Sequence, residues 1–200
     1  MQIILHNVGK RFNRDWIFRH VHLNFEPSKR YAIIGTNGSG KSTLLQILAG
    51  AIQPIEGTIS WMKNDLAADA IDITAIAAPY LELIEELNAL ELLDFHRKFK
   101  TLNGSNEQIL TSVGLANAAE KMIVNYSSGM KQRLKLALVF FSNAPVLLFD
   151  EPFTNLDRDG IAIFQQLMDK LPSEKTVIIS SNVEEEYAGC TELIRIADYK

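Results

Sequence analysis

A glycine-rich segment with one lysine lies in the first quarter of the chain. It reads Gly-Thr-Asn-Gly-Ser-Gly-Lys-Ser-Thr over residues 35–43. Glycines let the backbone turn so that consecutive amide N–H groups converge on an anion. The Lys41 ammonium can then reach the outer phosphates of a nucleotide, and the Ser42 hydroxyl can bind Mg²⁺. The segment therefore predicts an ATP phosphate site formed by Gly35, Thr36, Asn37, Gly38, Ser39, Gly40, Lys41, Ser42 and Thr43.

Two adjacent carboxylates follow an apolar run at residues 146–149, namely Asp150 and Glu151. A glycine-rich phosphate loop of this kind, called a P-loop, works together with an acidic residue at the end of a buried strand that holds Mg²⁺. We predict this role for Asp150. Glu151 is then placed to polarise the water that attacks the γ-phosphate. Taken alone, the pair has an alternative interpretation as two solvated acids that open a loop.

These groups need a scaffold of alternating strands and helices. Apolar or alternating runs predict strands at 2–5, 31–34, 58–62, 71–77, 146–149, 176–180 and 193–197. Helical patterns cover 42–49, 131–142 and 159–171. Asn88 with Glu91, and Ser105 with Gln108, have the spacing of capping boxes and predict two more helix starts. Residues 184–186, three glutamates, predict a solvated helix start.

Composition limits the classes of partner. The net charge of −4 lacks the basic excess of a protein that binds phosphate backbones, so nucleic acid is not an expected partner. No apolar stretch approaches the roughly 20 residues that span a bilayer, and the N-terminus does not have the pattern of a signal peptide. Any membrane role is therefore expected to depend on a partner protein. A single cysteine, Cys190, excludes an internal disulfide.

These motifs resemble the nucleotide-binding domain of ABC transporters over nearly the whole chain. The most specific part, residues 126–133, reads Tyr-Ser-Ser-Gly-Met-Lys-Gln-Arg and is similar to the signature motif LSGGQ. The resemblance implies that this segment binds ATP held by a second subunit, so that ATP joins a head-to-tail dimer. The signature residues would be Ser127, Ser128, Gly129 and Met130. A simple helix cap at Ser127 is the alternative interpretation.

Other positions take their expected roles from the same resemblance. Residues 152–157 are similar to the D-loop, and Asp157 would cross the dimer interface. Phe12 lies where the family places an aromatic ring that stacks on adenine, and Trp16 is a rival for that role. The membrane-spanning partner would dock on residues 80–87, for which ordinary helix packing of Tyr80, Leu83 and Leu87 is the alternative.

Two positions depart from the family pattern, and both lie near the γ-phosphate in the family. Ala78 stands where the family usually has a glutamine, and its methyl group cannot coordinate metal or orient water. Asn182 stands where the family commonly has a histidine; it can donate an N–H but cannot carry a proton. Losing one electrostatic donor commonly lowers a rate on the order of 10²-fold. We therefore predict tight binding of Mg²⁺-ATP with slow hydrolysis.

The resemblance implies an α/β fold, a P-loop ABC cassette with a mostly parallel core sheet, an N-terminal antiparallel β portion and a helical subdomain at roughly residues 79–145 of one domain, 1–200. It implies an ATP-binding and ATP-hydrolysing transporter subunit with ATP and Mg²⁺ as cofactors, in which Lys41, Glu151 and Asn182 are catalytic. Its partners would be a membrane-spanning subunit and a second ABC subunit, on the cytoplasmic, inner face of the cell membrane.

Two alternatives stay open at this stage. One is a soluble ABC-type nucleotide switch with weak or lost hydrolysis, and the other is an ABC protein that remodels a nucleic acid or ribosome. Import and export, and homodimer and heterodimer, are equally open.

Overall fold

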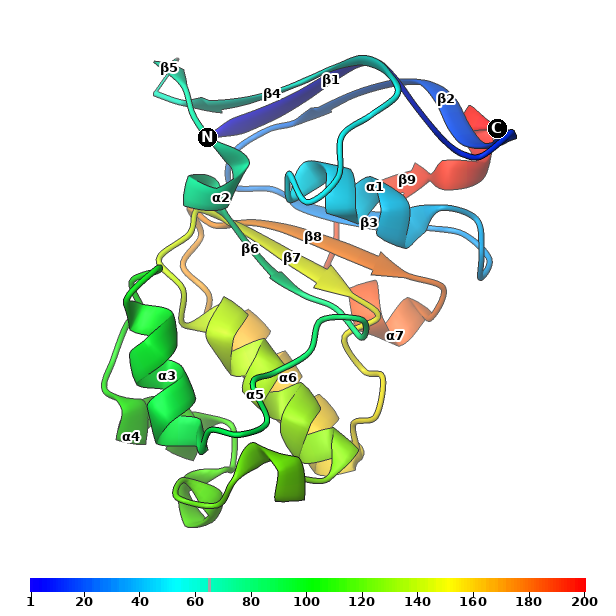
Figure 1. Ribbon diagram of the computed structural model, residues 1–200. Coiled ribbons are helices and arrows are strands. Elements are labelled where there is room, and N and C mark those ends of the chain that lie inside the picture. The colour runs from blue at the N-terminus through cyan, green and yellow to red at the C-terminus, as the bar shows by residue number, and fades with distance from the viewer. Residues whose placement is uncertain (65) are drawn as a thin grey trace. The chain divides into compact units, whose positions relative to one another are not determined.

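The computed structural model describes residues 1–64 and 66–200, and its elements are labelled in Figure 1. The chain divides into two compact units. The first, which we call the β-rich unit, comprises Met1–Ile76, Ala144–Glu151 and Ser173–Lys200. The second, which we call the helical unit, comprises Ala77–Asn143 and Pro152–Pro172.

An antiparallel sheet opens the β-rich unit, as the sequence predicts. Its strand order is β2-β1-β4-β5, with β1 (Gln2–Phe12), β2 (Asp15–Phe25), β4 (Glu56–Lys63) and β5 (Leu66–Ala67). The strand expected at 2–5 extends to Phe12, and β2 was not predicted. The pairing of β1 and β2 shifts register between Leu5 and Val8, and Asn7 and His20 adopt left-handed backbone conformations. These irregularities interrupt the period-2 alternation that would have revealed the hairpin.

The second sheet of the unit has the order β6-β7-β8-β3-β9 and consists of β3 (Arg30–Ile34), β6 (Thr74–Ala77), β7 (Val146–Asp150), β8 (Thr176–Ser181) and β9 (Glu192–Arg195). Strands β7, β8, β3 and β9 pair in parallel. Every residue of β7 and β8 is buried, which explains the continuous apolar runs at 146–149 and 177–179. The predicted α/β class, with its antiparallel N-terminal portion, is confirmed.

Two predicted strands are wrong over part of their length. The first three residues of the strand expected at 71–77 belong to the short helix α2 (Ala70–Ile73). The hydroxyl of Thr74, the next residue, donates to the carbonyl of Ala70 at 2.8 Å. The strand expected at 193–197 ends at Arg195, where the chain enters the 3-10 turn η3 (Ile196–Tyr199). Short apolar runs do not distinguish a strand from one buried helical turn.

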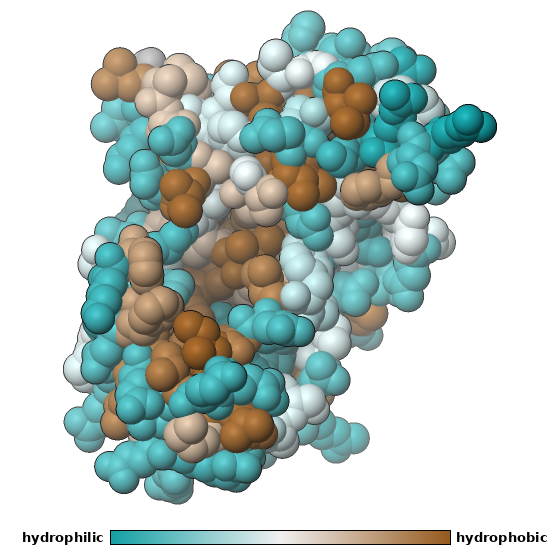
Figure 2. All heavy atoms as spheres, viewed as in Figure 1, coloured by the Kyte–Doolittle hydropathy of each residue, from teal (hydrophilic) through white to brown (hydrophobic). Residues whose placement is uncertain are grey.

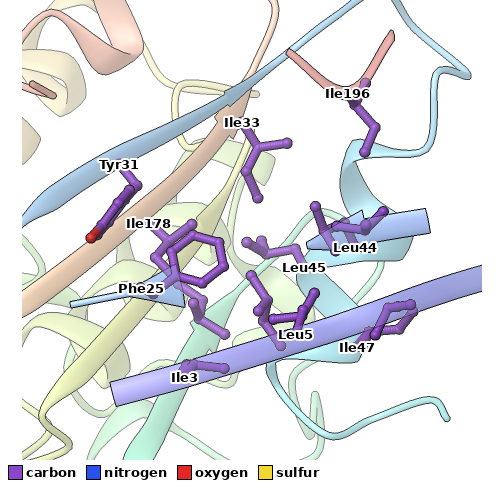
Figure 3. Close-up of a cluster of buried hydrophobic side chains, with 14 of the residues drawn as sticks. Ile3, Leu5, Phe25, Tyr31, Ile33, Leu44, Leu45, Ile47, Ile178 and Ile196 are labelled. Atoms are coloured by element: carbon purple, nitrogen blue, oxygen red, sulfur yellow. The ribbon is translucent and has the colours of Figure 1, made fainter. Parts of the chain in front are cut away.

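Helix α1 (Lys41–Leu48) packs in the core of the β-rich unit. Figure 3 shows side chains from the antiparallel sheet, from α1, from β3 and β8 and from η3 pointing toward one another. Ile33, Leu44 and Leu45 are fully buried there. Burial of each such side chain contributes about 1.5–3 kcal/mol to the free energy of folding relative to an exposed side chain. This core therefore holds α1 against the sheet.

The helical unit contains α3 (Ala89–Arg97), α4 (Asn106–Ser112), η1 (Ala116–Ala118), η2 (Ile123–Asn125), α5 (Ser128–Phe140) and α6 (Arg158–Asp169). Both predicted capping boxes are confirmed: the Asn88 side chain accepts from the Glu91 N–H at 2.9 Å, and Ser105 accepts from the Gln108 N–H at 3.2 Å. Leu93, Ile109 and Leu134 form part of a separate buried cluster. None of the helices in residues 1–64 and 66–200 is long and apolar enough to cross a membrane.

The C-terminal part of the β-rich unit contains one buried and one half-buried polar side chain, Glu186 and Cys190. Helix α7 (Glu184–Tyr187) begins with the three glutamates, but Glu186 is buried and accepts a hydrogen bond from the Ser181 hydroxyl. The prediction of a solvated helix start is therefore wrong for Glu186. The Cys190 thiol donates to the Tyr31 carbonyl at 3.3 Å, and burial raises the pKa of this thiol to about 11.

Candidate functional site

The parallel sheet brings three chain segments to one edge. Asp150 of β7 is in register with Ser180 of β8, which is in register with Ile33 of β3. Because parallel strands end on the same side of a sheet, the glycine-rich loop, the acidic pair and the segment after β8 all leave at this edge. Ligands of open α/β sheets bind at this position.

The glycine-rich loop has the backbone that its sequence predicts. Gly38 and Gly40 have φ values of 74° and 106°, in the left-handed region that favours glycine. A Cβ on Gly40 would lie 2.4 Å from Cγ2 of Ile17, so a larger residue could not follow this path without displacing the Ile17 side chain. Gly40 is also the N-cap of α1 and offers no side-chain cap, which leaves the first N–H groups of the helix available for an anion.

The Lys41 side chain is held inside this loop. The residue is 4% exposed, and its ammonium donates to the carbonyl oxygens of Gly35 at 3.0 Å and Thr36 at 3.2 Å. An ammonium has three N–H donors, so these two bonds leave one for a phosphate oxygen.

A pocket of about 180 Å³ contains most of the predicted phosphate and catalytic residues. Its lining consists of Ile17, Asn37, Gly38, Gly40, Lys41, Ser42, Thr43 and Glu151. Glu151 has a φ of 44°, an uncommon conformation for a residue with a Cβ, and its N–H donates to the Ser180 carbonyl at 2.8 Å. The turn after β7 thus directs Glu151 into the same pocket as Lys41 and Ser42. Ile17 was not predicted, because its strand was not recognised.

Asp150 is 1% exposed, and its Oδ1 atom has no hydrogen-bond partner among the residues that the structure describes. A buried carboxylate oxygen without a partner is unfavourable, and a bound cation or its water would satisfy it. Carboxylate and hydroxyl oxygens are the ligands that Mg²⁺ prefers. The residues present therefore fit a magnesium ion.

The remaining predicted residues of the β-rich unit lie elsewhere. Asn182 is exposed and lines a second pocket together with Gly35, Thr36 and Ser39. Phe12 is 49% exposed, and the Lys10 ammonium lies 5.4 Å from its ring centre. The structure thus places neither Asn182 nor Phe12 in the wall of the 180 Å³ pocket.

The signature segment and the D-loop lie together in the helical unit. Ser127 is the N-cap of α5, and its hydroxyl accepts from the Met130 N–H at 3.2 Å. A Cβ on Gly129 would lie 2.9 Å from the carbonyl oxygen of Asn155, so glycine allows the two segments to approach. Asp157 caps α6 by accepting from the Gly160 N–H at 2.8 Å.

Ala78, also in the helical unit, is fully buried. Its carbonyl and that of Pro79 face the Lys135 ammonium of α5 at 3.5 and 3.2 Å. Burial lowers the pKa of Lys135, while the charge of Glu82 opposes that change. The segment that follows β6 therefore presents a buried methyl group and backbone carbonyls that accept from a lysine.

The sequence profile of the family described as ABC transporter matches residues 18–154, which include the glycine-rich loop, the signature segment and the acidic pair. The chain belongs to the ABC transporter family. The chain is 30% identical over 203 residues to the lantibiotic transport ATP-binding protein SrtF of Streptococcus pyogenes, covering 95% of this chain and 84% of that protein. It is 26% identical to the cytochrome c biogenesis ATP-binding export protein CcmA of Haemophilus influenzae, over 100% of this chain and 97% of the relative.

A solved ABC structure supports the same assignment. The ATP-binding cassette MJ0796, determined as a dimer in a post-hydrolysis state with ADP and phosphate, superposes with a TM-score of 0.80 at 25% identity, covering 92% of this chain and 90% of that one. The protein is accordingly an ATP-binding, P-loop ATPase subunit of the ABC transporter type.

Proposed function

We propose that Lys41, Ser42, Asp150 and Glu151 carry out Mg²⁺-dependent ATP hydrolysis at the edge of the parallel sheet. The observation that carries the proposal is that Lys41, Ser42 and Glu151 line one pocket, while the adjacent Asp150 is buried with an unpartnered oxygen. The loop amides and Lys41 hold the phosphates, through Gly35, Thr36, Asn37, Gly38, Ser39, Gly40 and Thr43. In this proposal residues 1–200 act as one domain with its helical subdomain at roughly 79–145.

Ser42 and Asp150 would hold Mg²⁺, which neutralises phosphate charge during the reaction. Glu151 would orient the attacking water and accept hydrogen bonding from it. Asn182 would donate its amide N–H to the γ-phosphate of bound ATP. The amide cannot supply the positive charge that a protonated imidazole would carry. This division of roles favours firm nucleotide binding and slow turnover.

We propose a second ABC subunit as the partner across the nucleotide. The MJ0796 cassette was determined as a dimer, which supports this arrangement. Ser127, Ser128, Gly129 and Met130 would bind the phosphates of ATP held by that subunit, and Asp157 would contact the opposite site. Phe12 would stack on adenine.

A membrane-spanning subunit is the second proposed partner, on the cytoplasmic face of the cell membrane. The names of SrtF and CcmA, a transport protein and an export protein, support it. Figure 2 shows hydrophobic residues gathered on the viewed face of the helical unit around α3. Within residues 80–87, Tyr80, Leu81 and Ile84 are 44%, 37% and 39% exposed, whereas Leu83 and Leu87 pack against the buried cluster.

The docking surface in this proposal is therefore Tyr80, Leu81 and Ile84. Glu82 and Glu86 are exposed between and beside these residues. A partner segment with apolar and basic side chains would match this combination.

A nucleotide switch with weak hydrolysis is the second candidate function, and one observation favours it. Ala78 is fully buried and presents only a methyl group at the position where the family's glutamine acts. Binding and release of ATP, rather than repeated turnover, would then control the partner.

Steady-state and single-turnover hydrolysis of the purified chain tests the two candidates. Glu151→Gln should lower turnover by at least about 10²-fold and leave the Kd for ATP within about threefold, because only the water-polarising carboxylate is lost. Glu120→Gln removes an exposed carboxylate of the helical unit and serves as the matched control. Equal turnover in Glu151→Gln and wild type would contradict the role of Glu151, and a wild-type chain that binds ATP without any turnover would favour the switch.

A further inference from the structure

Ser180 of β8 carries a buried hydroxyl that nothing in the surrounding fold satisfies. The residue is fully buried, and its Oγ atom has no hydrogen-bond partner in residues 1–64 and 66–200. Burying a hydroxyl without a partner is unfavourable, because its bonds to water are lost and not replaced. Such a group can gain its partner from what the neighbouring site binds.

Strand register places this hydroxyl next to Asp150. The two residues are Cα partners in the parallel pairing of β7 with β8, which lie side by side in Figure 1. Side chains of paired residues, and of residues two positions apart on a strand, lie on the same face of a sheet. Leu148 and Ile178, the pair two residues earlier, belong to the core cluster that includes Leu44 of α1. Asp150 and Ser180 therefore continue the face covered by α1 toward the edge where the P-loop leaves.

The residues in register with Ser180 limit what its hydroxyl can bond. On the β3 side the partner is Ile33, whose side chain has no polar atom. On the β7 side the partner is Asp150, whose Oδ1 atom is also buried and without a hydrogen-bond partner among the described residues. The two oxygens are thus buried neighbours that do not bond to each other. One water molecule that donates a hydrogen to each of them would satisfy both.

The backbone of Ser180 contacts the second carboxylate residue of the site. The Ser180 carbonyl accepts from the Glu151 N–H at 2.8 Å, at the point where Glu151 adopts its left-handed conformation. Because this bond uses only backbone atoms, replacing the Ser180 side chain leaves it in place. A change of side chain at this position therefore acts on the surroundings of Asp150 and not on the turn that directs Glu151.

We propose that Ser180 is a positioning residue for the Mg²⁺ of bound nucleotide. The proposal rests on the proposed function, in which Asp150 helps to hold that ion. Mg²⁺ in nucleotide sites usually keeps several water ligands. The Ser180 hydroxyl accepts one hydrogen of such a water and Asp150 Oδ1 accepts the other, so that the two side chains together orient the hydration shell of the ion. Groups that orient metal ligands in this way commonly raise metal affinity.

Binding of Mn²⁺, a paramagnetic substitute for Mg²⁺, tests the proposal without hydrolysis. Electron paramagnetic resonance measures the Kd for Mn²⁺ of the chain saturated with the β,γ-imido analogue of ATP. Ser180→Ala should raise this Kd about tenfold, because a group that orients a metal ligand is lost. Ser180→Thr keeps a hydroxyl and should stay within about threefold of wild type. The Kd for the analogue in the absence of divalent metal should not change in either variant.

Thr176, at the opposite end of β8, offers a matched control. It is 1% exposed, and its hydroxyl accepts from the Ser28 N–H at 3.1 Å. Thr176→Val should therefore unfold at a lower temperature than wild type and keep its affinity for Mn²⁺. Metal-free Ser180→Ala should unfold at the wild-type temperature or above it, since its hydroxyl has no partner to lose. A purely structural role for Ser180 would give the opposite result, a lower unfolding temperature with unchanged affinity for Mn²⁺.

Asp150→Asn separates this proposal from the proposed function. If Asp150→Asn leaves the Kd for Mn²⁺ unchanged, Asp150 does not hold the metal, and both proposals are wrong. If Asp150→Asn weakens Mn²⁺ binding while folded Ser180→Ala binds Mn²⁺ as tightly as wild type, the role of Asp150 stands and that of Ser180 is overturned. Weaker binding in both variants, with affinity kept in Ser180→Thr and Thr176→Val, is the expected result.

Discussion

The phosphate loop and the segment after β6 differ in what they offer to a bound nucleotide. The loop offers backbone N–H groups and a buried ammonium, and the nearby Asp150 has one oxygen, Oδ1, without a hydrogen-bond partner among the described residues. The segment after β6 offers a buried methyl at Ala78 and backbone carbonyls already bonded to Lys135. In our proposal the groups that hold phosphate are therefore complete, whereas Ala78 replaces a group that would assist the attacking water. We therefore expect changes in the segment after β6 to alter hydrolysis more than they alter nucleotide binding.

The largest effect is expected from the binding side of this comparison. Lys41→Ala should weaken the Kd for ATP about 10²-fold, because a charge-assisted contact to phosphate is lost. Equilibrium binding of a fluorescent ATP analogue measures this change. Lys63→Ala, at an exposed position of β4, is the control. If both variants bind equally well, the loop does not hold the outer phosphates.

A smaller effect is expected where the sequence departs from the family next to the γ-phosphate. Asn182→His should raise turnover about tenfold, since an imidazole can carry a proton that the amide cannot. Single-turnover hydrolysis at saturating ATP measures the step. Asn125→His, on the exposed surface of the helical unit, controls for an added histidine. Unchanged turnover in Asn182→His would show that slow hydrolysis has another origin.

The smallest effect on turnover is expected from Ala78→Gln, which introduces the glutamine that the family pattern has. Since Ala78 is fully buried, the larger side chain of Ala78→Gln should overpack the site and lower the free energy of unfolding by about 1–3 kcal/mol. Denaturant unfolding measures this, with the exposed Ala116→Gln, expected within about 0.5 kcal/mol of wild type, as the control. A stable Ala78→Gln variant with faster hydrolysis would show that the glutamine alone had been limiting.

Local patterns predicted the elements whose cause is local. The glycine-rich loop and both capping boxes follow from residues within a few positions of one another, and the structure has them where expected. The hairpin strand β2 was missed because its bulges disturb the alternation. The sequence predicted a solvent-exposed Glu186, but the Glu186 carboxylate accepts a hydrogen bond from Ser181, which precedes the helix. No local pattern shows this contact.

The second pocket, which Asn182 lines together with Gly35, Thr36 and Ser39, also contains Arg195, and this arginine could not be predicted from the sequence. Its place in this pocket requires Arg195 of β9 to be in register with Ile34 of β3, a pairing between residues far apart in the chain. No motif links these two positions, and register across a parallel sheet is decided by the packing of the whole core. The sequence thus identified the chemistry of the phosphate loop but not what surrounds it.

The half-buried thiol of Cys190 has a practical consequence for spectroscopy. With a pKa of about 11, only roughly one thiol in a thousand is ionised at pH 8, and the thiolate is the form that reacts with maleimides. Cys190 is also the only cysteine in the chain. A cysteine introduced at an exposed position could therefore be labelled with a fluorophore or spin probe while the native residue stays almost unmodified, which makes the wild-type sequence a ready background for following motion during the ATP cycle.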